Sequence, residues 1–450
     1  MKKVGFVSLG CPKNLVDSEV MMGQLKEAGY EITNNADEAE TLVVNTCGFI
    51  ESAKQESIEA ILEATQLKEQ GKAKRVVVAG CLVERYRDEL LKELPEVDAF
   101  IGTNEIDRIL EAADETKSFR ELPLLPIGNK TATYLYDFDT PRFRATDSYT
   151  AFIKIAEGCD RPCAFCSIPQ MRGSFRSRRF GSILKEAENL AKQGVKEVVL
   201  IAQDSSRFGE DLGEREALAK LIRALGEIEG LEWIRVMYAY PTHISDEFLN
   251  AIAETPKAVK YLDMPLQHAS RNVLKLMRRG GTRESLEKLI RRVREKVPGI
   301  TIRTTFITGF PGETEEDFEE LLTFVRNCEF DNVGVFTYSD EEGTPAYDLP
   351  NKVDPKIAKK RRDRLMKEQA KISKRKNKAK IGKTFRVLFE GLSQESDLLF
   401  QGRTEGQAQE IDGYILINDM PENFEPKIGE FYNVRITEAF EYDLIGEIIQ

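Results

Sequence analysis

The sequence contains no long apolar run and has little histidine. No stretch approaches the roughly 18 consecutive apolar residues that a bilayer-spanning helix needs, so no membrane partner is expected. The start of the chain, Met1 to Leu9, is too short for a signal peptide and is typical of a first strand. Only two histidines are present, His243 and His268, so few residues could complete a four-ligand zinc site.

Cysteine is also scarce, with seven residues in a chain of 450. An odd number of cysteines in a large chain without an export signal favours reduced thiols, and we expect a cytoplasmic protein. The length suggests about three domains of roughly 150 residues each. The net charge of -11 disfavours a simple nucleic-acid binder, so any contact with RNA is expected to be secondary at most.

Three cysteines, Cys159, Cys163 and Cys166, lie close together after the strand-like run Tyr149 to Ala156. Soft thiolates of this kind select zinc, copper or an iron–sulfur cluster. A closed structural zinc site needs four ligands, and no fourth Cys or His is nearby. Three thiolates leave one metal position open, as a catalytic cluster requires. We therefore favour an iron–sulfur cluster here over zinc or thiols without a metal.

Residues 1–145 alternate strand-like and helix-like patterns. Short apolar runs suited to buried parallel strands alternate with stretches of helical periodicity. The predicted strands are Val4–Leu9, Thr41–Thr46 and Arg75–Gly80, and the predicted helices are Asn14–Ala28 and Phe49–Gln66. This order predicts a doubly wound α/β domain, followed by a linker from Glu121 to Pro141 that contains three prolines.

Each of these strands is followed at once by a cysteine: Cys11, Cys47 and Cys81. Parallel strands place their carboxyl ends on one edge of the sheet, where such sheets bind ligands. The three thiols can therefore meet in space despite their separation in the sequence. Free Cys is often a small core residue, but three in equivalent places favour a second cluster, again with an open iron.

Residues 146–375 show a second series of strands and helices. Six strand–helix units fit a partial parallel (β/α)6 barrel, whose active site would lie at the carboxyl ends of the strands. The predicted strands are Phe152–Ala156, Glu197–Ala202, Trp233–Tyr238, Tyr261–Pro265, Thr301–Thr308 and Asn332–Tyr338. His268, after the fourth strand, is either an acid or base or a hydrogen-bonded structural histidine.

The last part of the chain differs in charge and pattern. Residues 352–380 carry 14 Lys and Arg against 3 Asp and Glu, on a helical period. This helix either closes the barrel as a solvated element or contacts RNA or an acidic surface. Residues 380–450 change to five short strands with glycine turns and predict a small antiparallel β-barrel.

The segment from Gly158 to Cys166 resembles the signature of radical S-adenosylmethionine enzymes, including the aromatic Phe165 before the last cysteine. The resemblance implies that Cys159, Cys163 and Cys166 hold a [4Fe–4S] cluster. Its open iron would chelate S-adenosylmethionine, and an electron from the cluster would release a 5′-deoxyadenosyl radical. The strand tips with Gln203, Gln267 and Gly309 would surround this cofactor, although each Gln is equally well explained as a loop-stabilising amide.

Further motifs narrow the likeness to the methylthiotransferase family. They are Leu9-Gly10-Cys11-Pro12-Lys13-Asn14, Ser167-Ile168-Pro169, Arg172-Gly173 and Ser177-Arg178. This resemblance implies that Cys11, Cys47 and Cys81 hold an auxiliary [4Fe–4S] cluster that takes part in sulfur insertion. It also implies that the C-terminal barrel is a TRAM domain.

Within this family, the chain resembles the group that modifies an aspartate of the twelfth small-subunit ribosomal protein. The motifs from Leu9 to Asn14, Asp263 to His268 and Arg278 to Arg283 carry this likeness. The implied reaction joins a methylthio group to the aspartate β-carbon and needs a low-potential electron donor and a sulfur donor. A sister group, which modifies N6-isopentenyladenosine in transfer RNA, is the alternative.

The charge of the C-terminal domain can distinguish between these two substrates, a ribosomal protein and transfer RNA. Residues 381–450 contain 5 Lys and Arg and 14 Asp and Glu. Such a domain repels a phosphate backbone and attracts a basic polypeptide. The sequence therefore favours a basic ribosomal protein, with an aspartate-containing loop, as the substrate.

Overall fold

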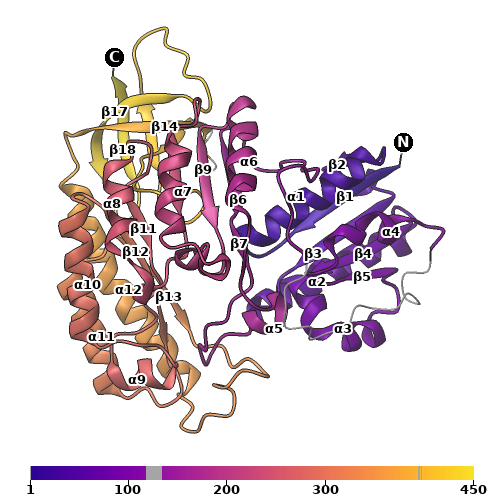
Figure 1. The fold of residues 1–450 in the computed structure, drawn as a ribbon, viewed down its shortest axis with the longest axis horizontal. Coiled ribbons are helices and arrows are strands. Elements are labelled where there is room, and N and C mark those ends of the chain that lie inside the picture. Colours follow the sequence, from indigo (N-terminus) through magenta and orange to yellow (C-terminus); the bar gives the residue numbers. More distant parts are fainter. Residues whose placement is uncertain (1, 118–133, 394–395, 397, 450) are drawn as a thin grey trace.

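A computed structural model describes residues 2–117, 134–393, 396 and 398–449. Part of the predicted linker, residues 121–133, lies outside the described residues. Figure 1 shows an N-terminal α/β unit beside a barrel, with a smaller β structure at one end of that barrel. Among the described residues, no helix is both long enough and apolar enough to cross a bilayer.

The N-terminal sheet is parallel throughout, with the strand order β2-β1-β3-β4-β5. Its strands are β1 (Lys3–Ser8), β2 (Glu31–Thr33), β3 (Thr41–Thr46), β4 (Arg75–Gly80) and β5 (Ala99–Ile101). The helices that flank it are α1 (Pro12–Glu27), α2 (Glu51–Glu69), α3 (Cys81–Glu93) and α4 (Ile109–Ala113). The doubly wound α/β prediction is thus confirmed, with two short edge strands that the sequence pattern did not reveal.

Successive side chains along the buried strands point to opposite faces of the sheet, and the apolar side chains on both faces are covered by helices. Val43 and Val77 face a core shared with α1 and α4, whereas Val44 and Val78 face a core shared with α2 and α3. The α1 side also packs against the barrel, where the strand that contains Phe152 adjoins the same apolar cluster. This packing fixes the carboxyl edge of the first sheet beside the barrel.

Six parallel strands form the partial barrel, as predicted. They are β6 (Thr150–Lys154), β9 (Glu197–Ile201), β10 (Trp233–Val236), β11 (Tyr261–Asp263), β12 (Thr301–Thr308) and β13 (Asn332–Thr337). They pair as two three-stranded sheets, and a parallel bridge from Ile234 to Ala258 lies between these sheets. The covering helices are α6 (Phe180–Lys192), α7 (Ala217–Gly226), α8 (Asp246–Glu254), α10 (Arg283–Lys296), α11 (Glu315–Cys328) and α12 (Pro355–Lys378).

Shorter elements complete the barrel's rim. They are β7 (Ala156–Glu157), β8 (Arg176–Ser177), α5 (Ile168–Arg172), α9 (Arg271–Leu276) and the 3-10 turns Ser205–Arg207, Glu210–Leu212 and Pro241–His243. Two further 3-10 turns, Ala36–Glu38 and Ile106–Arg108, belong to the N-terminal domain. Thr314 and Asp317 form a capping box at the start of α11, and this satisfies backbone N–H groups of its first turn. The basic segment forms α12, which buries Leu365 and Ile372 against the barrel, so it closes this domain.

The C-terminal strands close into a barrel in the order β14-β15-β16-β18-β17. They are β14 (Thr384–Leu392), β15 (Phe400–Arg403), β16 (Ile415–Asp419), β17 (Phe431–Ala439) and β18 (Leu444–Ile449). The prediction of five strands is confirmed, but the pairing is not wholly antiparallel. β16 and β18 pair in parallel, because five strands in a closed barrel cannot alternate direction at every neighbouring pair.

This C-terminal barrel docks on the amino-terminal ends of the parallel strands, opposite their active-site edge. Arg403 is fully buried there and donates to Glu197 (2.7 Å), the first residue of β9, and to Glu390 (2.6 Å). Burial alone would raise the pKa of Glu197, but Arg403 and Arg235 lower it to about 2. The junction is therefore an ionised, buried pair network, which becomes strongly destabilising when one partner is removed.

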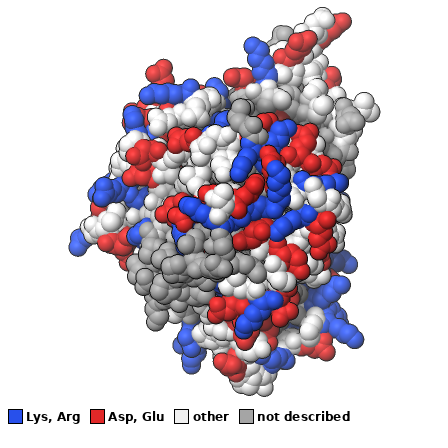
Figure 2. Space-filling view, turned by 90° about the vertical axis from the view of Figure 1, so that its right-hand side faces the viewer, with Lys and Arg blue, Asp and Glu red and all other residues white. Residues whose placement is uncertain are grey.

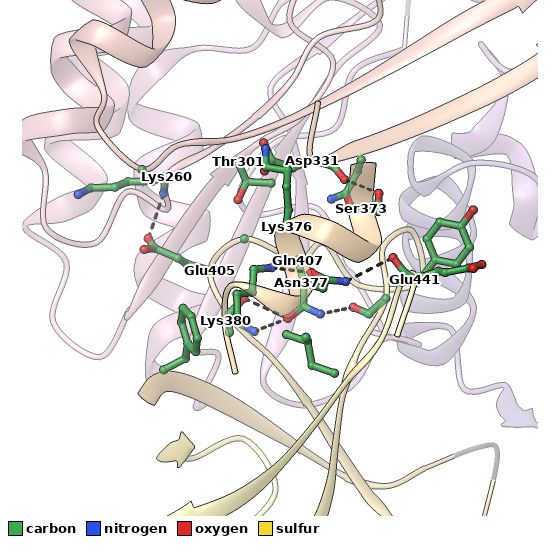
Figure 3. Close-up of a pocket in the computed structure, with 18 residues that line it drawn as sticks. Lys260, Thr301, Asp331, Ser373, Lys376, Asn377, Lys380, Glu405, Gln407 and Glu441 are labelled. Carbon is green, nitrogen blue, oxygen red and sulfur yellow. Dashed lines mark hydrogen bonds and ion pairs between the residues drawn. The ribbon is translucent and has the colours of Figure 1, made fainter. Parts of the chain in front are cut away.

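A polar cavity of about 210 Å³ lies in the same junction (Figure 3). Its walls come from the starts of the barrel strands, from α12 and from the C-terminal domain. Lys260 donates its backbone N–H to Glu405 (3.1 Å), and Lys380 donates to Asn377 (3.0 Å). None of the predicted site residues lines this cavity, so the candidate site lies elsewhere.

Figure 2 looks onto the side of the molecule that carries the N-terminal domain. Lys, Arg, Asp and Glu side chains are interspersed over the visible part of this face. Residues 381–450, which dock at the amino-terminal ends of the barrel strands, carry 14 Asp and Glu against 5 Lys and Arg.

Candidate active site between two cysteine trios

A cavity of about 420 Å³ opens between the N-terminal domain and the barrel. It lies at the carboxyl ends of the strands of both units, where parallel sheets bind ligands. Six of the seven cysteines line it: Cys11, Cys47, Cys81, Cys159, Cys163 and Cys166. The structure therefore brings both predicted trios to one space.

The first trio sits at three consecutive strand ends of the N-terminal sheet. Cys11 is the N-cap of α1, Cys47 follows β3, and Cys81 is the first residue of α3. Gly10 has a φ of +90°, and a Cβ at this position would lie 2.8 Å from the Cβ of Cys47, so only glycine fits this turn. Burial raises the pKa of the Cys81 thiol to about 12.

The second trio lies on the loop between β7 and α5. Cys159 donates its N–H to Gly173 O (3.0 Å), and Cys166 donates its N–H to Cys163 O (3.2 Å). These bonds fold the loop so that the three side chains face the cavity. Burial raises the pKa of Cys159 to about 11 and that of Cys166 to about 12. The guanidinium of Arg279 lies 3.5 Å from Cys163 Sγ.

Each donor set consists of three thiolates, the ligand type that iron–sulfur clusters use. Among the described residues, no three His, Cys, Asp or Glu side chains converge closely enough to hold one metal ion. In a [4Fe–4S] cluster each cysteine binds a different iron, so its three thiolates must be spaced more widely than around one ion. Three thiolates also leave the fourth iron free for another ligand.

A buried ion-pair network joins the two units directly beside the cavity. Lys154 from β6 donates to Asp17 of α1 (2.5 Å) and to Glu157 (2.6 Å), while Arg172 donates to Asp17 (2.6 Å) and to Asn14 (3.0 Å). Burial alone would raise the pKa of Glu157, but Lys154 and Arg172 lower it to about 2. We call Asn14, Asp17, Lys154, Glu157 and Arg172 the interdomain clamp.

Three family models match this chain, one in each of its three parts. The family model described as uncharacterized protein family UPF0004 matches residues 3–102, the radical SAM superfamily model matches residues 153–325, and the TRAM domain model matches residues 381–449. The ribosomal protein uS12 methylthiotransferase RimO of Solibacter usitatus is 52% identical over 449 residues, which cover 99% of this chain and 95% of the relative. The protein of the same name from Desulforamulus reducens is 47% identical over 450 residues, with 100% of both chains covered.

The chain belongs to the RimO methylthiotransferase family.

Solved structures agree in fold. The radical S-adenosylmethionine methyltransferase TsrM from Kitasatospora setae has a TM-score of 0.54 at 16% identity and covers 77% of each chain. At this identity the likeness concerns architecture alone. The radical SAM match itself implies one [4Fe–4S] cluster and S-adenosylmethionine.

The predicted cofactor contacts divide in two groups. Phe165, Gln203 and Gln267 line the cavity, and the buried Oε1 atoms of both glutamines have no hydrogen-bond partner. Such orphaned acceptors suit a RimO-family cofactor that carries amino and hydroxyl donors. Gly309 does not line the cavity, and its predicted contact with the cofactor stays a prediction. Its positive φ of +78° instead lets the chain pass closely against Ala358 of α12.

Sequence reasoning missed several residues that line the RimO-family cavity. Lys13, Arg161, Arg172 and Arg279 bring positive charge to it, against the single carboxylate of Asp204. Arg161 is paired with this carboxylate at 2.7 Å. Lys13 and Arg172 stand in the motifs that carry the family likeness, beside Cys11 and Gly173. Their place in these motifs indicated that they could lie near the site, but nothing in the sequence pattern indicated which side chains would face the cavity.

His268 is a structural histidine, and it does not line the cavity. It is fully buried, and its Nδ1 accepts the backbone N–H of Ser270 at 3.0 Å. Burial lowers its pKa to about 3. Asp263 is likewise structural, since it accepts hydrogen bonds from Arg303 (2.7 Å) and from the N–H of Tyr238 (3.0 Å).

Replacing His268 with Asn is expected to reduce the folding free energy that the protein loses for each unit by which the pH falls. The unfolded chain protonates this histidine below pH about 6.5, while the folded chain resists protonation down to about pH 3. Each pH unit in this window therefore costs about 1.4 kcal/mol of folding free energy. Urea unfolding between pH 6 and 4 measures this slope. The wild type is the reference, and an equally steep slope in His268→Asn would contradict the assignment.

Proposed function

We propose that this chain attaches a methylthio group to the β-carbon of an aspartate in ribosomal protein uS12. The proposal draws on the activity named for relatives that match this chain along its whole length, and on one observation of the structure. Six cysteines, contributed by two separate units, line a single cavity. An unactivated carbon must meet a hydrogen-abstracting group and a sulfur source in turn, and a shared cavity allows both without release of the substrate.

Each trio has its own proposed role. Cys159, Cys163 and Cys166 would hold the cluster that binds S-adenosylmethionine, while Cys11, Cys47 and Cys81 would hold a second [4Fe–4S] cluster. Bound together, these groups supply a 5′-deoxyadenosyl radical and the sulfur for insertion. The chain's own residues orient the reactants: Gln203 and Gln267 offer unpaired amide oxygens, and Phe165 forms part of the apolar wall.

The proposed domain roles follow the boundaries 1–145, 146–375 and 380–450. The first carries the auxiliary cluster, the second the S-adenosylmethionine site, and the third is the TRAM domain. Because the third domain docks at the opposite end of the barrel strands, its negative charge does not act inside the cavity. A basic substrate that contacts both the third domain and the cavity would have to extend along the barrel. We further propose a cytoplasmic setting, a low-potential electron donor and a sulfur donor, with RNA contact secondary.

The test is a direct comparison of substrates. Reconstituted enzyme is incubated without oxygen with S-adenosylmethionine, a reductant, sulfide and either uS12 or transfer RNA containing N6-isopentenyladenosine. We expect a methylthio mass increase on one aspartate peptide of uS12. Methylthiolated RNA together with unmodified protein would overturn the proposal in favour of the sister activity.

A further inference from the structure

We propose that Lys13 binds the side-chain carboxylate of the substrate's target residue and so selects an acidic residue. This inference rests on the proposed function above and adds the group that recognises the reacting side chain. Its observations are the burial of Lys13, its place on the cavity wall and the charges around it.

Lys13 is a buried cation without a counter-ion. Its side chain lines the cavity while the residue as a whole is only 7% exposed. The Nζ lies 3.5 Å from the ring centroid of Tyr238, and no Asp or Glu among the described residues forms an ion pair with it. A buried charge is normally paired, so an ammonium that faces a cavity without a carboxylate points to an anionic ligand.

The other cations of the cavity are already occupied. Arg172 belongs to the interdomain clamp, and Arg161 is paired with Asp204. Arg279 contacts Cys163 Sγ and donates to Pro265 O (2.7 Å), so its guanidinium lies beside the second trio. Lys13 is thus the cation that remains available on the side of the first trio.

The backbone around Lys13 also favours an anion. Lys13 lies in the first turn of α1, whose N-cap Cys11 makes no side-chain capping bond and whose first turn contains no acidic residue. No carboxylate of the chain itself therefore neutralises the positive end of the helix. A carboxylate in the cavity would meet both the ammonium and this helix end.

Tyr238 holds the ammonium in place. Its φ of +63° is rare for a bulky residue, and the conformation is held by bonds from its N–H to Asp263 (3.0 Å) and from the N–H of Ser205 to its carbonyl (3.0 Å). The resulting ring face attracts the cation. The subsite is therefore built by elements of both units before any ligand arrives.

The experiment measures binding of two peptides to the reconstituted enzyme. One is the aspartate-containing loop of uS12, and the other carries Asn in place of the target Asp. We expect Lys13→Met to weaken binding of the Asp peptide by about 10- to 100-fold, because charge-assisted hydrogen bonds are the strong ones. The affinity for the Asn peptide should change little, and Lys13→Arg should restore part of the preference for Asp.

Lys26→Met is the matched control. Lys26 lies on the same helix with its Nζ 4.3 Å from the ring centroid of Phe143, but it is exposed and does not line the cavity. It should leave both affinities unchanged. Equal weakening of both peptides in Lys13→Met, or no weakening, overturns the inference. Weaker binding of S-adenosylmethionine with unchanged peptide affinity also overturns it, because the ammonium would then serve the cofactor's carboxylate. If the wild type binds neither peptide, the proposed function itself fails.

Discussion

Replacing Cys47 with Ser is expected to abolish methylthiolation while leaving cleavage of S-adenosylmethionine in place. Iron content should fall from about eight to about four atoms per chain, because each [4Fe–4S] cluster contributes four. Cys47 belongs to the trio on the N-terminal sheet, whereas cofactor cleavage is assigned to the trio on the barrel loop. The measurements are iron analysis, 5′-deoxyadenosine release and the mass of the uS12 peptide.

Two further variants make this separation informative. Cys163→Ser should also lower the iron content by half, but it should abolish 5′-deoxyadenosine release together with the product. Cys328→Ala removes the seventh cysteine, which is buried at the end of α11 and does not line the cavity. It should keep about eight irons and full activity. Loss of 5′-deoxyadenosine release in Cys47→Ser would contradict separate roles for the two trios.

The clustering of the cysteines could be predicted from the sequence, because it follows from regular secondary structure. Parallel strands end on one edge, so Cys11, Cys47 and Cys81 had to meet once the βαβ order was recognised. The CxxxCxxC loop needed no long-range information at all. Short edge strands such as β5 escaped the pattern because three residues carry no measurable period.

The contacts across the cavity could not be predicted in the same way. Lys154 and Asp17 are 137 positions apart and lie in different units, and neither residue type at its place signals the other. Gly309 shows the same limit, because the sequence placed it at a strand tip but did not reveal that α12 would pack against it. The parallel β16–β18 pair likewise depends on the closed strand order rather than on any local pattern.

Breaking the interdomain clamp is expected to uncouple the two units. Asp17→Asn removes the carboxylate that Lys154 and Arg172 share, and all three side chains are buried. Removing one partner of a buried ion pair costs about 3–5 kcal/mol. Lys154 and Arg172 would then share the single carboxylate of Glu157, so one buried positive charge stays uncompensated. The cost falls on the contact between α1 and the barrel, which aligns the first trio with the second.

The consequence for activity is a loss of alignment rather than of either cysteine trio. A displacement of about 1 Å between reacting groups can reduce a rate by roughly 100-fold, so the methylthiolated product should fall by that order. Release of 5′-deoxyadenosine should continue, because Cys159, Cys163 and Cys166 all lie on one barrel loop. The ratio of 5′-deoxyadenosine to product therefore rises, and amide hydrogen exchange should increase along α1 and β6. Asp37→Asn, which removes an exposed ion pair to Lys72 in the same domain, is the control and should alter neither quantity. An unchanged ratio in Asp17→Asn would mean that apolar packing alone holds the two trios in register.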